Sequence, residues 1–233
     1  MKNKILSLWS LFSEILRLPV ARLCFSLELN PLDVRRTHKN FTKPHPTYKL
    51  FRNKSLGVAL IALDGFASSK DYLESINGKN SAAYYARKAR ARGYRLAEIE
   101  RNDFVDDIHE INTSAELRQG RAMAPAYLEK TTHYDSEANY RYYGVLDAEG
   151  KLLAYCNLGL YGNFVLVSQL LGHKNALNDG VMYLMLADIV SAVIEEFRFT
   201  YVMYDTFFGA QAGLKLFKVK LGFQSYRVKY SIQ

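Results

Sequence analysis

The chain has 233 residues, 49% of them hydrophobic and 23% charged, with 14 Gly and 5 Pro. These values are close to the globular average and exclude a disordered or fibrous protein, and two cysteines cannot form a disulfide framework. The net charge of +8 is uneven, because residues 1–60 hold 11 Lys and Arg against 3 Asp and Glu, whereas residues 61–233 hold 20 of each kind. The basic excess predicts either contact with an anionic partner or a solvated leader.

The apolar stretch from Ile5 to Leu18 carries polar residues at spacings of three to four, which predicts an amphipathic helix that Pro19 ends. Glu14 and Arg17 interrupt the apolar run, so a secretory signal and a transmembrane span are both disfavoured. Two interpretations stay open for this helix. It packs on the rest of the protein, or it lies in a membrane interface with its basic side chains on anionic lipid.

The segment from Asn30 to Lys54 is polar and basic and contains three prolines. This composition predicts an extended connector with little core of its own. We therefore expect residues 1–56 to form a basic leader and residues 57–233 to form one domain. The reducing environment suggested by the scarce cysteines favours a cytoplasmic location, with a position on the membrane surface as the alternative.

From residue 56 onward, hydrophobic periods typical of strands and of helices alternate along the chain. The predicted strands are 56–63, 94–100, 140–146, 152–160, 164–171, 199–204 and 223–232. The predicted helices are 68–92, 103–117, 179–197 and 214–220. A loop over 116–128 carries Arg118 and Arg121. This order predicts an α/β (α+β) fold with a mixed sheet flanked by helices.

Three segments resemble the Gcn-related N-acyltransferase (GNAT) superfamily, and within it the Fem-type (FemAB-like) branch, which attaches amino acids or acyl groups to amines. They are DYLESINGKNSAAYYARKARARGY (71–94), DGVMYLMLADIVSAVIEE (179–196) and QAGLKLFKVKLGF (211–223). The resemblance covers roughly residues 57–233. It implies a mostly antiparallel sheet in which one parallel strand pair, 164–171 and 199–204, splays apart.

The family chemistry implied by this resemblance is attack of an amine on a thioester or ester carbonyl. The donor's long carrier would lie between the splayed strands, and the N-terminus of the next helix would receive its pyrophosphate. The sequence departs from the family pattern at two points. The loop 173–180 has a single late glycine, Gly180, beside an anionic Asp179, and Lys218 stands where many relatives have a tyrosine that protonates the departing thiolate.

The resemblance suggests catalytic roles for His173, Tyr204 and Asp205, since the carboxyl ends of parallel strands are where ligands gather. A loop, turn or helix-cap role is the alternative for each. Arg118 and Arg121 are candidates for binding a carboxylate or phosphate of the substrate, or are surface residues. No metal ligands are expected, and Cys156 is interpreted as a buried apolar residue. The expected donor-binding residues are Leu170, Leu171, His173, Lys174, Asn175, Asn178, Gly180 and Lys218.

These observations predict an N-acyltransferase that moves an acyl group from acyl-CoA or acetyl-CoA to a primary amine of a small molecule or peptide. The first alternative is transfer of an aminoacyl group from tRNA, whose phosphates the basic N-terminus would contact. The second alternative is a non-catalytic module that binds an anionic partner or membrane surface through residues 1–60.

Overall fold

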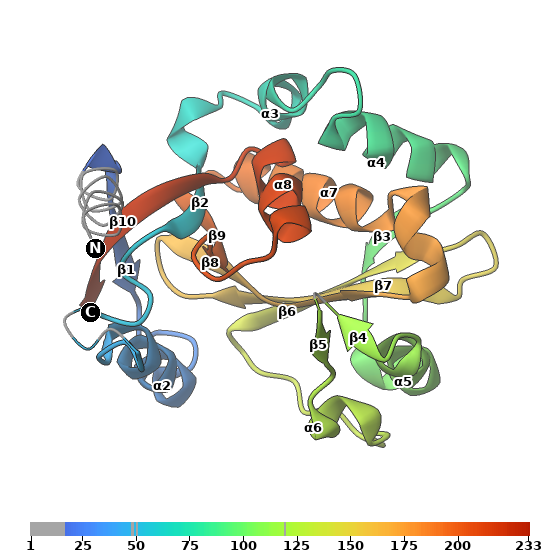
Figure 1. Cartoon of the computed structure of the whole chain (residues 1–233), viewed down its shortest axis with the longest axis horizontal. Helices are drawn as coiled ribbons and strands as arrows, with labels where there is room; N and C mark the ends of the chain where they lie inside the picture. The colour runs from blue at the N-terminus through green and yellow to red at the C-terminus, as the bar shows by residue number, and fades with distance from the viewer. Residues whose placement is uncertain (1–16, 48, 50, 119) are drawn as a thin grey trace, which may run out of the picture.

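A computed structural model describes residues 17–47, 49, 51–118 and 120–233. Figure 1 shows a central twisted sheet with helices on both faces. The eight strands follow the order β1-β10-β2-β9-β8-β7-β6-β3, and only the pairs β1/β10 and β8/β9 are parallel among the described strands. The expected α/β (α+β) fold, with a mixed and mostly antiparallel sheet, is confirmed. The strands are β1 (Val20–Phe25), β2 (Val58–Ala62), β3 (Arg95–Glu98), β6 (Tyr140–Leu146), β7 (Leu152–Leu160), β8 (Phe164–Gly172), β9 (Tyr201–Thr206) and β10 (Gln224–Ile232).

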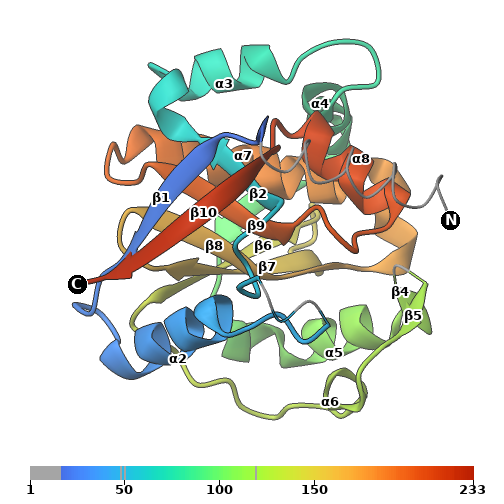
Figure 2. The same cartoon turned by 60° about the vertical axis from the view of Figure 1, so that its left-hand side comes forward.

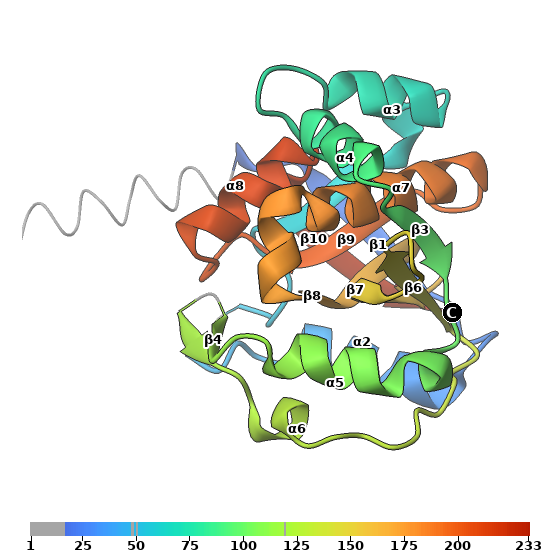
Figure 3. The same cartoon turned by 90° about the vertical axis from the view of Figure 1, so that its right-hand side faces the viewer.

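The helices divide between the two faces of the sheet. In Figures 1 and 3, α3, α4, α7 and α8 cover one face, and α2, α5 and α6 lie on the other. A small hairpin, β4 (Leu117–Arg118) and β5 (Arg121–Ala122), lies outside the main sheet. The helices are α2 (Pro31–Thr42), α3 (Ser69–Ser75), α4 (Ala82–Ala91), α5 (Val105–Thr113), α6 (Pro125–Leu128), α7 (Val181–Glu195) and α8 (Ala212–Lys220).

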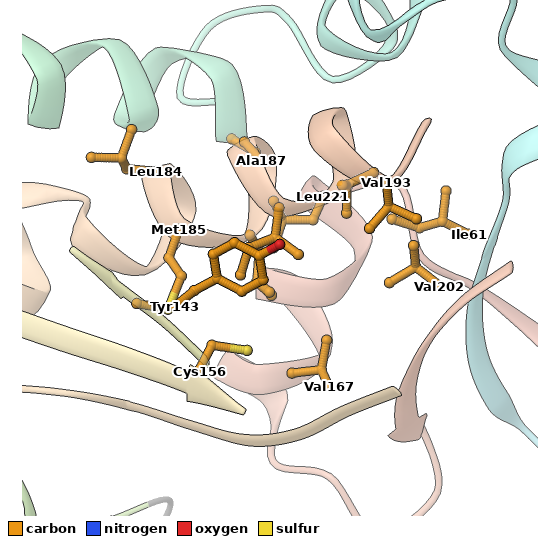
Figure 4. Packing of buried hydrophobic residues seen from close by; sticks show 14 of the residues in the cluster. Ile61, Tyr143, Cys156, Val167, Leu184, Met185, Ala187, Val193, Val202 and Leu221 are labelled. Carbon is orange, nitrogen blue, oxygen red and sulfur yellow. The ribbon is translucent and has the colours of Figure 1, made fainter. Parts of the chain in front are cut away.

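Helix α7 is the centre of the larger core. It buries apolar side chains along most of its circumference, because the sheet lies below it and α3 and α4 pack against it on the outside. Figure 4 shows this packing, with Met185 of α7 near Tyr143 and Cys156 of the sheet and Leu184 on the opposite side of the helix. Cys156 is fully buried in this cluster, and burial raises the pKa of its thiol. Its interpretation as an apolar core residue therefore agrees with the structure.

The prediction of an extended connector over residues 30–54 is wrong for Pro31–Thr42, because these residues form α2. The Asn30 side chain accepts a hydrogen bond from the backbone N–H of Asp33, and Pro31 occupies the first turn, so the helix starts at a well-formed cap. Val34 and Phe41 are buried beneath it. The helix predicted between Ile5 and Leu18 lies outside the described residues except for its last two positions.

The segment before α2 also belongs to the sheet. In β1, Ala21, Leu23 and Phe25 are buried and alternate with more exposed residues, so one face of the strand enters the core. The strand pairs in parallel with β10 over its whole length, as Figure 2 shows at the edge of the sheet. The expected boundary at residue 56 thus does not coincide with a break in packing, since residues 20–42 contribute to the same fold.

Two further expectations need correction. The single helix predicted over 68–92 is two helices, α3 and α4, because Gly78 has a positive φ of 145° and Ser81 caps a new helix by accepting from the backbone N–H of Tyr84. The helix predicted over 103–117 ends at Thr113, and the loop that follows holds the β4–β5 hairpin and α6.

Candidate active site

Strands β8 and β9 form a fork. They pair only through Phe164–Tyr201, Val165–Val202 and Leu166–Met203, although β8 continues for six further residues. Beyond Leu166, the edge of β8 that faces β9 has no partner strand in the described chain. Apart from the Gly172 carbonyl, which accepts from Arg118, the backbone N–H and C=O groups on this edge have no strand to pair with and can bind a ligand that enters between the two strands. The splayed parallel pair expected from the sequence is confirmed.

Lys218 is the buried cation beside this fork. It comes from α8, is 1% exposed, and its Nζ donates to the backbone carbonyl of Thr206 at the end of β9, at 2.9 Å. The same ammonium lies 4.5 Å from the centroid of the Tyr204 ring. Lys218 is buried because it shares the inward face of α8 with Leu221, which is fully buried in the core. The Thr206 carbonyl and the rings of Tyr204 and Phe207, the latter with its centroid at 5.7 Å, replace the water that a lysine ammonium normally keeps.

Burial lowers the pKa of Lys218 to about 8, a change that Lys54 reinforces and Asp205 opposes. A lysine with this pKa is partly neutral at physiological pH. It can then accept a proton from a substrate ammonium and return that proton to a leaving group. Among the residues expected to bind the donor, Lys218 is therefore the one whose surroundings fit it for proton transfer.

Tyr204 and Asp205 lie together at the β9 side of the fork. The Tyr204 ring contacts Phe223 edge-on, and burial raises the pKa of its phenol. Asp205 has a φ of 52°, which is uncommon for a residue with a side chain, and its carboxylate forms an ion pair with Lys54. Lys54 was not singled out from the sequence. Tyr204, Asp205, Lys218 and Lys54 thus form one cluster, which we call the fork cluster.

His173 does not join the fork cluster. It follows the last residue of β8, seven positions beyond Leu166, which corresponds to about 23 Å of extended strand. Its Nε2 lies 3.3 Å from a carboxylate oxygen of Glu110, and its Nδ1 accepts from the backbone N–H of Asn175. The backbone N–H of Lys174 donates to the Ser114 hydroxyl. His173 and Asp205 therefore lie in different surroundings, and the catalytic role suggested for His173 stays a prediction.

The start of α7 carries its own counter-ions. Gly180, with a φ of 88°, precedes the helix, and a Cβ there would meet the Tyr85 carbonyl oxygen at 2.4 Å. The Asp179 carboxylate lies 3.1 Å from the Arg92 guanidinium and accepts from the Tyr94 hydroxyl, also at 3.1 Å. An anionic group of the chain therefore already lies beside this helix N-terminus. The side chains of Lys174, Asn175 and Asn178 are exposed in the preceding turn.

The remaining predicted site residues have different surroundings. Arg118 donates to the backbone carbonyls of Gly172 and Ile111, so its guanidinium links the β4–β5 hairpin to the ends of β8 and α5. Burial lowers its pKa. Arg121 is exposed at the hairpin. Leu171 is buried and Leu170 is half-buried on the diverging part of β8. Their proposed contacts with donor or substrate stay predictions.

A pocket that was not predicted from the sequence lies on the opposite face of the sheet, near α2, α5 and α6. It has two connected parts of about 420 and 300 Å³ that share five lining residues. Four tyrosines and two carboxamide side chains form much of its wall, and we call it the tyrosine pocket. They are Tyr127, Tyr134, Tyr140, Tyr142, Asn157 and Gln169. The closely spaced tyrosines in 140–143 are the sequence signal for this pocket, but from the sequence they predict only a strand.

Within the part of the chain that the structure describes, no group of three His, Cys, Asp or Glu side chains is arranged to hold a metal ion. In the same residues, no helix has both the length and the apolar character needed to cross a membrane.

No family model and no curated protein matches the chain. Among solved structures, FemX matches with a TM-score of 0.55 at 10% identity, over 73% of this chain and 59% of the FemX chain. The C-terminal domain (DUF2156) of a putative lysylphosphatidylglycerol synthetase from Agrobacterium fabrum matches with a TM-score of 0.49 at 15% identity, over 73% and 58%. A tandem GNAT protein from the clavulanic acid pathway gives 0.47 at 17% identity, over 74% and 50%.

The forked sheet and the similarity to FemX define the class of fold: this chain has a fold similar to that of FemX. The resemblance to Fem-type proteins that the sequence motifs suggested agrees with this similarity of fold. The chain spans about three fifths of the FemX chain that it matches.

Proposed function

We propose that the protein is an N-acyltransferase in which an acyl donor lies in the β8–β9 fork and a primary amine attacks its carbonyl there. The observation that carries this proposal is Lys218, a buried lysine with a pKa of about 8 at the fork. Neutral Lys218 accepts the proton that the amine loses as the new C–N bond forms. The bond from the carbonyl carbon to the leaving group then breaks, and the leaving thiolate or alkoxide takes the proton from the Lys218 ammonium.

An acyl-CoA thioester, such as acetyl-CoA, is the first candidate donor. The unpaired edge of β8 after Leu166 suits an extended chain with amide groups, because such a chain can add to a strand edge through backbone hydrogen bonds. Leu170 and Leu171 on the same arm offer apolar contacts, and Lys174 lies exposed beyond the end of β8 to meet phosphate.

An aminoacyl-tRNA is the second candidate donor, and Asp179 favours it. A pyrophosphate at the start of α7 would be repelled by the Asp179 carboxylate. It would also compete with that carboxylate for the Arg92 guanidinium. A donor whose phosphates lie elsewhere avoids this repulsion. The basic residues of the N-terminal quarter would then contact the tRNA backbone, with a salt dependence that acyl-CoA binding would not share.

Thermal unfolding with acetyl-CoA, longer acyl-CoAs and charged tRNA tests the donor, because a ligand that binds only the folded state raises the melting temperature. Asp179→Asn sharpens the comparison. If acyl-CoA places its pyrophosphate at α7, removing the carboxylate should strengthen binding of acyl-CoA and leave binding of tRNA unchanged. Stabilisation by none of these donors would contradict the proposed function.

The catalytic role is tested by Lys218→Met, with Lys215→Met as the matched control on the exposed face of the same helix. Removal of a general base costs roughly 10²–10⁴-fold in rate. We expect such a loss in Lys218→Met and near wild-type transfer in Lys215→Met, with the wild-type rate rising through about pH 8. Full activity of Lys218→Met would exclude the proposed mechanism.

A further inference from the structure

The tyrosine pocket lies against the same strand that forms one side of the fork. Ser168 and Gln169 line the pocket and belong to β8, two and three residues beyond Leu166, where pairing with β9 stops. The pocket volume, about 420 Å³ in its larger part, falls within the usual range of roughly 300–1,000 Å³ for small-molecule sites. A molecule in this pocket is therefore next to the first open residues of the fork.

The pocket and Lys218 approach the fork from opposite faces of the sheet. Met203 packs in the core cluster on the α2 side of the sheet, the side on which the tyrosine pocket lies. Tyr204 packs instead with the cluster around α7, where Lys218 contacts its ring. The gap between β8 and β9 therefore separates a donor side from a pocket side, and the two reactants can meet within the gap.

The floor of the pocket has an unused hydrogen-bond acceptor. Asn157 is 9% exposed, and its Nδ2 donates to Oε1 of Gln169 at 2.7 Å. Gln169 in turn donates to the Tyr155 hydroxyl, at 3.1 Å. The Oδ1 atom of Asn157 has no hydrogen-bond partner among the described residues. A buried carbonyl oxygen without a partner costs about 1–3 kcal/mol, and because Oδ1 is shielded from solvent, a ligand hydroxyl satisfies it when the Asn157 side chain turns toward the pocket.

The walls combine aromatic faces with both signs of charge. The Arg101 guanidinium lies 3.8 Å from the centroid of the Tyr142 ring and 4.9 Å from that of Tyr134, so all three groups are held in place. Three carboxylates and two guanidinium groups line the larger part; they belong to Asp33, Asp135, Glu137, Arg36 and Arg101. The carboxylates disfavour a polyphosphate, and the many polar groups disfavour an acyl chain.

We propose that the tyrosine pocket holds the body of the acceptor and that this acceptor is a polyhydroxylated amine, that is, an amino sugar. Each sugar hydroxyl both donates and accepts, so it satisfies Asn157 Oδ1 and the charged groups alike. The C–H faces of a sugar ring pack against tyrosine rings, as apolar surface does. This inference rests on the proposed function for the direction in which the amine points, which is toward the fork.

Binding without any donor tests the pocket. The methyl glycosides of glucosamine and galactosamine are titrated in saturation-transfer NMR, alongside cyclohexylmethylamine and lysine amide as amines that lack the ring hydroxyls. We expect saturable binding of at least one amino sugar and weaker binding of both other amines. Tyr127→Ala and Gln169→Leu should each weaken sugar binding about tenfold, whereas Tyr84→Ala, an exposed tyrosine of α4, should not change it.

The outcomes separate the pocket from the chemistry. Lys218→Met should bind the amino sugar as the wild type does, because Lys218 lies on the other face of the sheet. Sugar binding that the wild type shows and that Tyr127→Ala and Gln169→Leu weaken, while no donor supports transfer, would count against the proposed function and leave the pocket assignment intact. Absence of binding by both sugars, equal or tighter binding of lysine amide, or binding insensitive to Tyr127→Ala and Gln169→Leu would overturn the assignment.

Discussion

Replacing Lys218 should change the pH dependence of stability in a direction that the structure fixes. Burial lowers the pKa of this lysine from its ordinary value of 10.5 to about 8 in the folded protein. Below pH 8, both the folded and the unfolded chain bind the proton, and the folded chain carries the full cost of a buried ammonium. Between pH 8 and 10.5 the unfolded chain binds more protons, so the free energy of unfolding rises with pH.

The size of the effect follows from the same two values. At about 1.4 kcal/mol for each pH unit, the difference between 10.5 and 8 corresponds to about 3 kcal/mol across the full window. Lys218→Met has no such proton, so its stability relative to wild type should fall by about 2–3 kcal/mol between pH 7 and pH 10. The tyrosines that also titrate at high pH are common to both proteins, and their contributions cancel in the comparison.

Urea unfolding at pH 7, 8, 9 and 10 measures this difference, with Lys215→Met as the exposed control. The control should follow the wild-type curve at every pH. If wild type and Lys218→Met keep a constant difference in unfolding free energy from pH 7 to pH 10, Lys218 has an ordinary pKa. Its role as a base at neutral pH would then have no physical basis.

Three other changes test separate parts of the fold. Arg118→Met removes hydrogen bonds to the Gly172 and Ile111 carbonyls and should lower the free energy of unfolding by about 1–3 kcal/mol in urea titrations, whereas Arg121→Met should have little effect. Gly180→Ala combines a left-handed φ with a clash on the Tyr85 carbonyl, so we expect a loss of at least about 1–2 kcal/mol, and an unchanged melting temperature would contradict the packing of α4 on α7. Burial opposes ionisation of Asp33, but hydrogen bonds from Arg36, Asn139 and Tyr161 outweigh it and lower the pKa. Stability from this group should therefore be present above pH 4 and lost as pH falls below it, and Asp33→Asn should flatten that acid limb in thermal scans.

The parts of the fold that sequence reasoning predicted correctly are those with strong local patterns. The hairpin of β6 and β7 has two apolar runs around a polar turn, and α7 has an apolar face over its whole length. The fork was predicted from the family resemblance, and it is confirmed by the pairing of β8 with β9 through only three residue pairs. In these segments, local periodicity and tertiary burial favour the same structure, so the sequence alone is informative.

The N-terminal part was predicted less well because its signals are short. Strand β1 has only three inward residues, and α2 buries two apolar side chains beneath many basic ones. Both elements depend on β10, a partner that is far away in sequence. Asn followed by Pro is typical of a helix start, but the connector was predicted from the basic composition and the prolines alone.

The candidate site was only partly predictable for a related reason. Tyr204, Asp205 and Lys218 were identified, yet nothing in the sequence distinguishes a buried Lys218 from an exposed Lys215 in the same short helix. His173 looked equally suitable and lies at the far end of β8. The tyrosine pocket is formed by residues from strands, helices and a loop that only the fold brings together, so its chemistry has no compact motif.

The position of β10 between β1 and β2 has a consequence for how the chain is made. A ribosome releases residues 20–25 and 58–62 long before residues 224–232, yet both early strands need the late one as a hydrogen-bonding neighbour. During synthesis, β1 has no place to dock and β2 shows an open edge, which is the arrangement that invites pairing with other chains. The sheet is therefore completed late in synthesis, when β10 pairs with both β1 and β2.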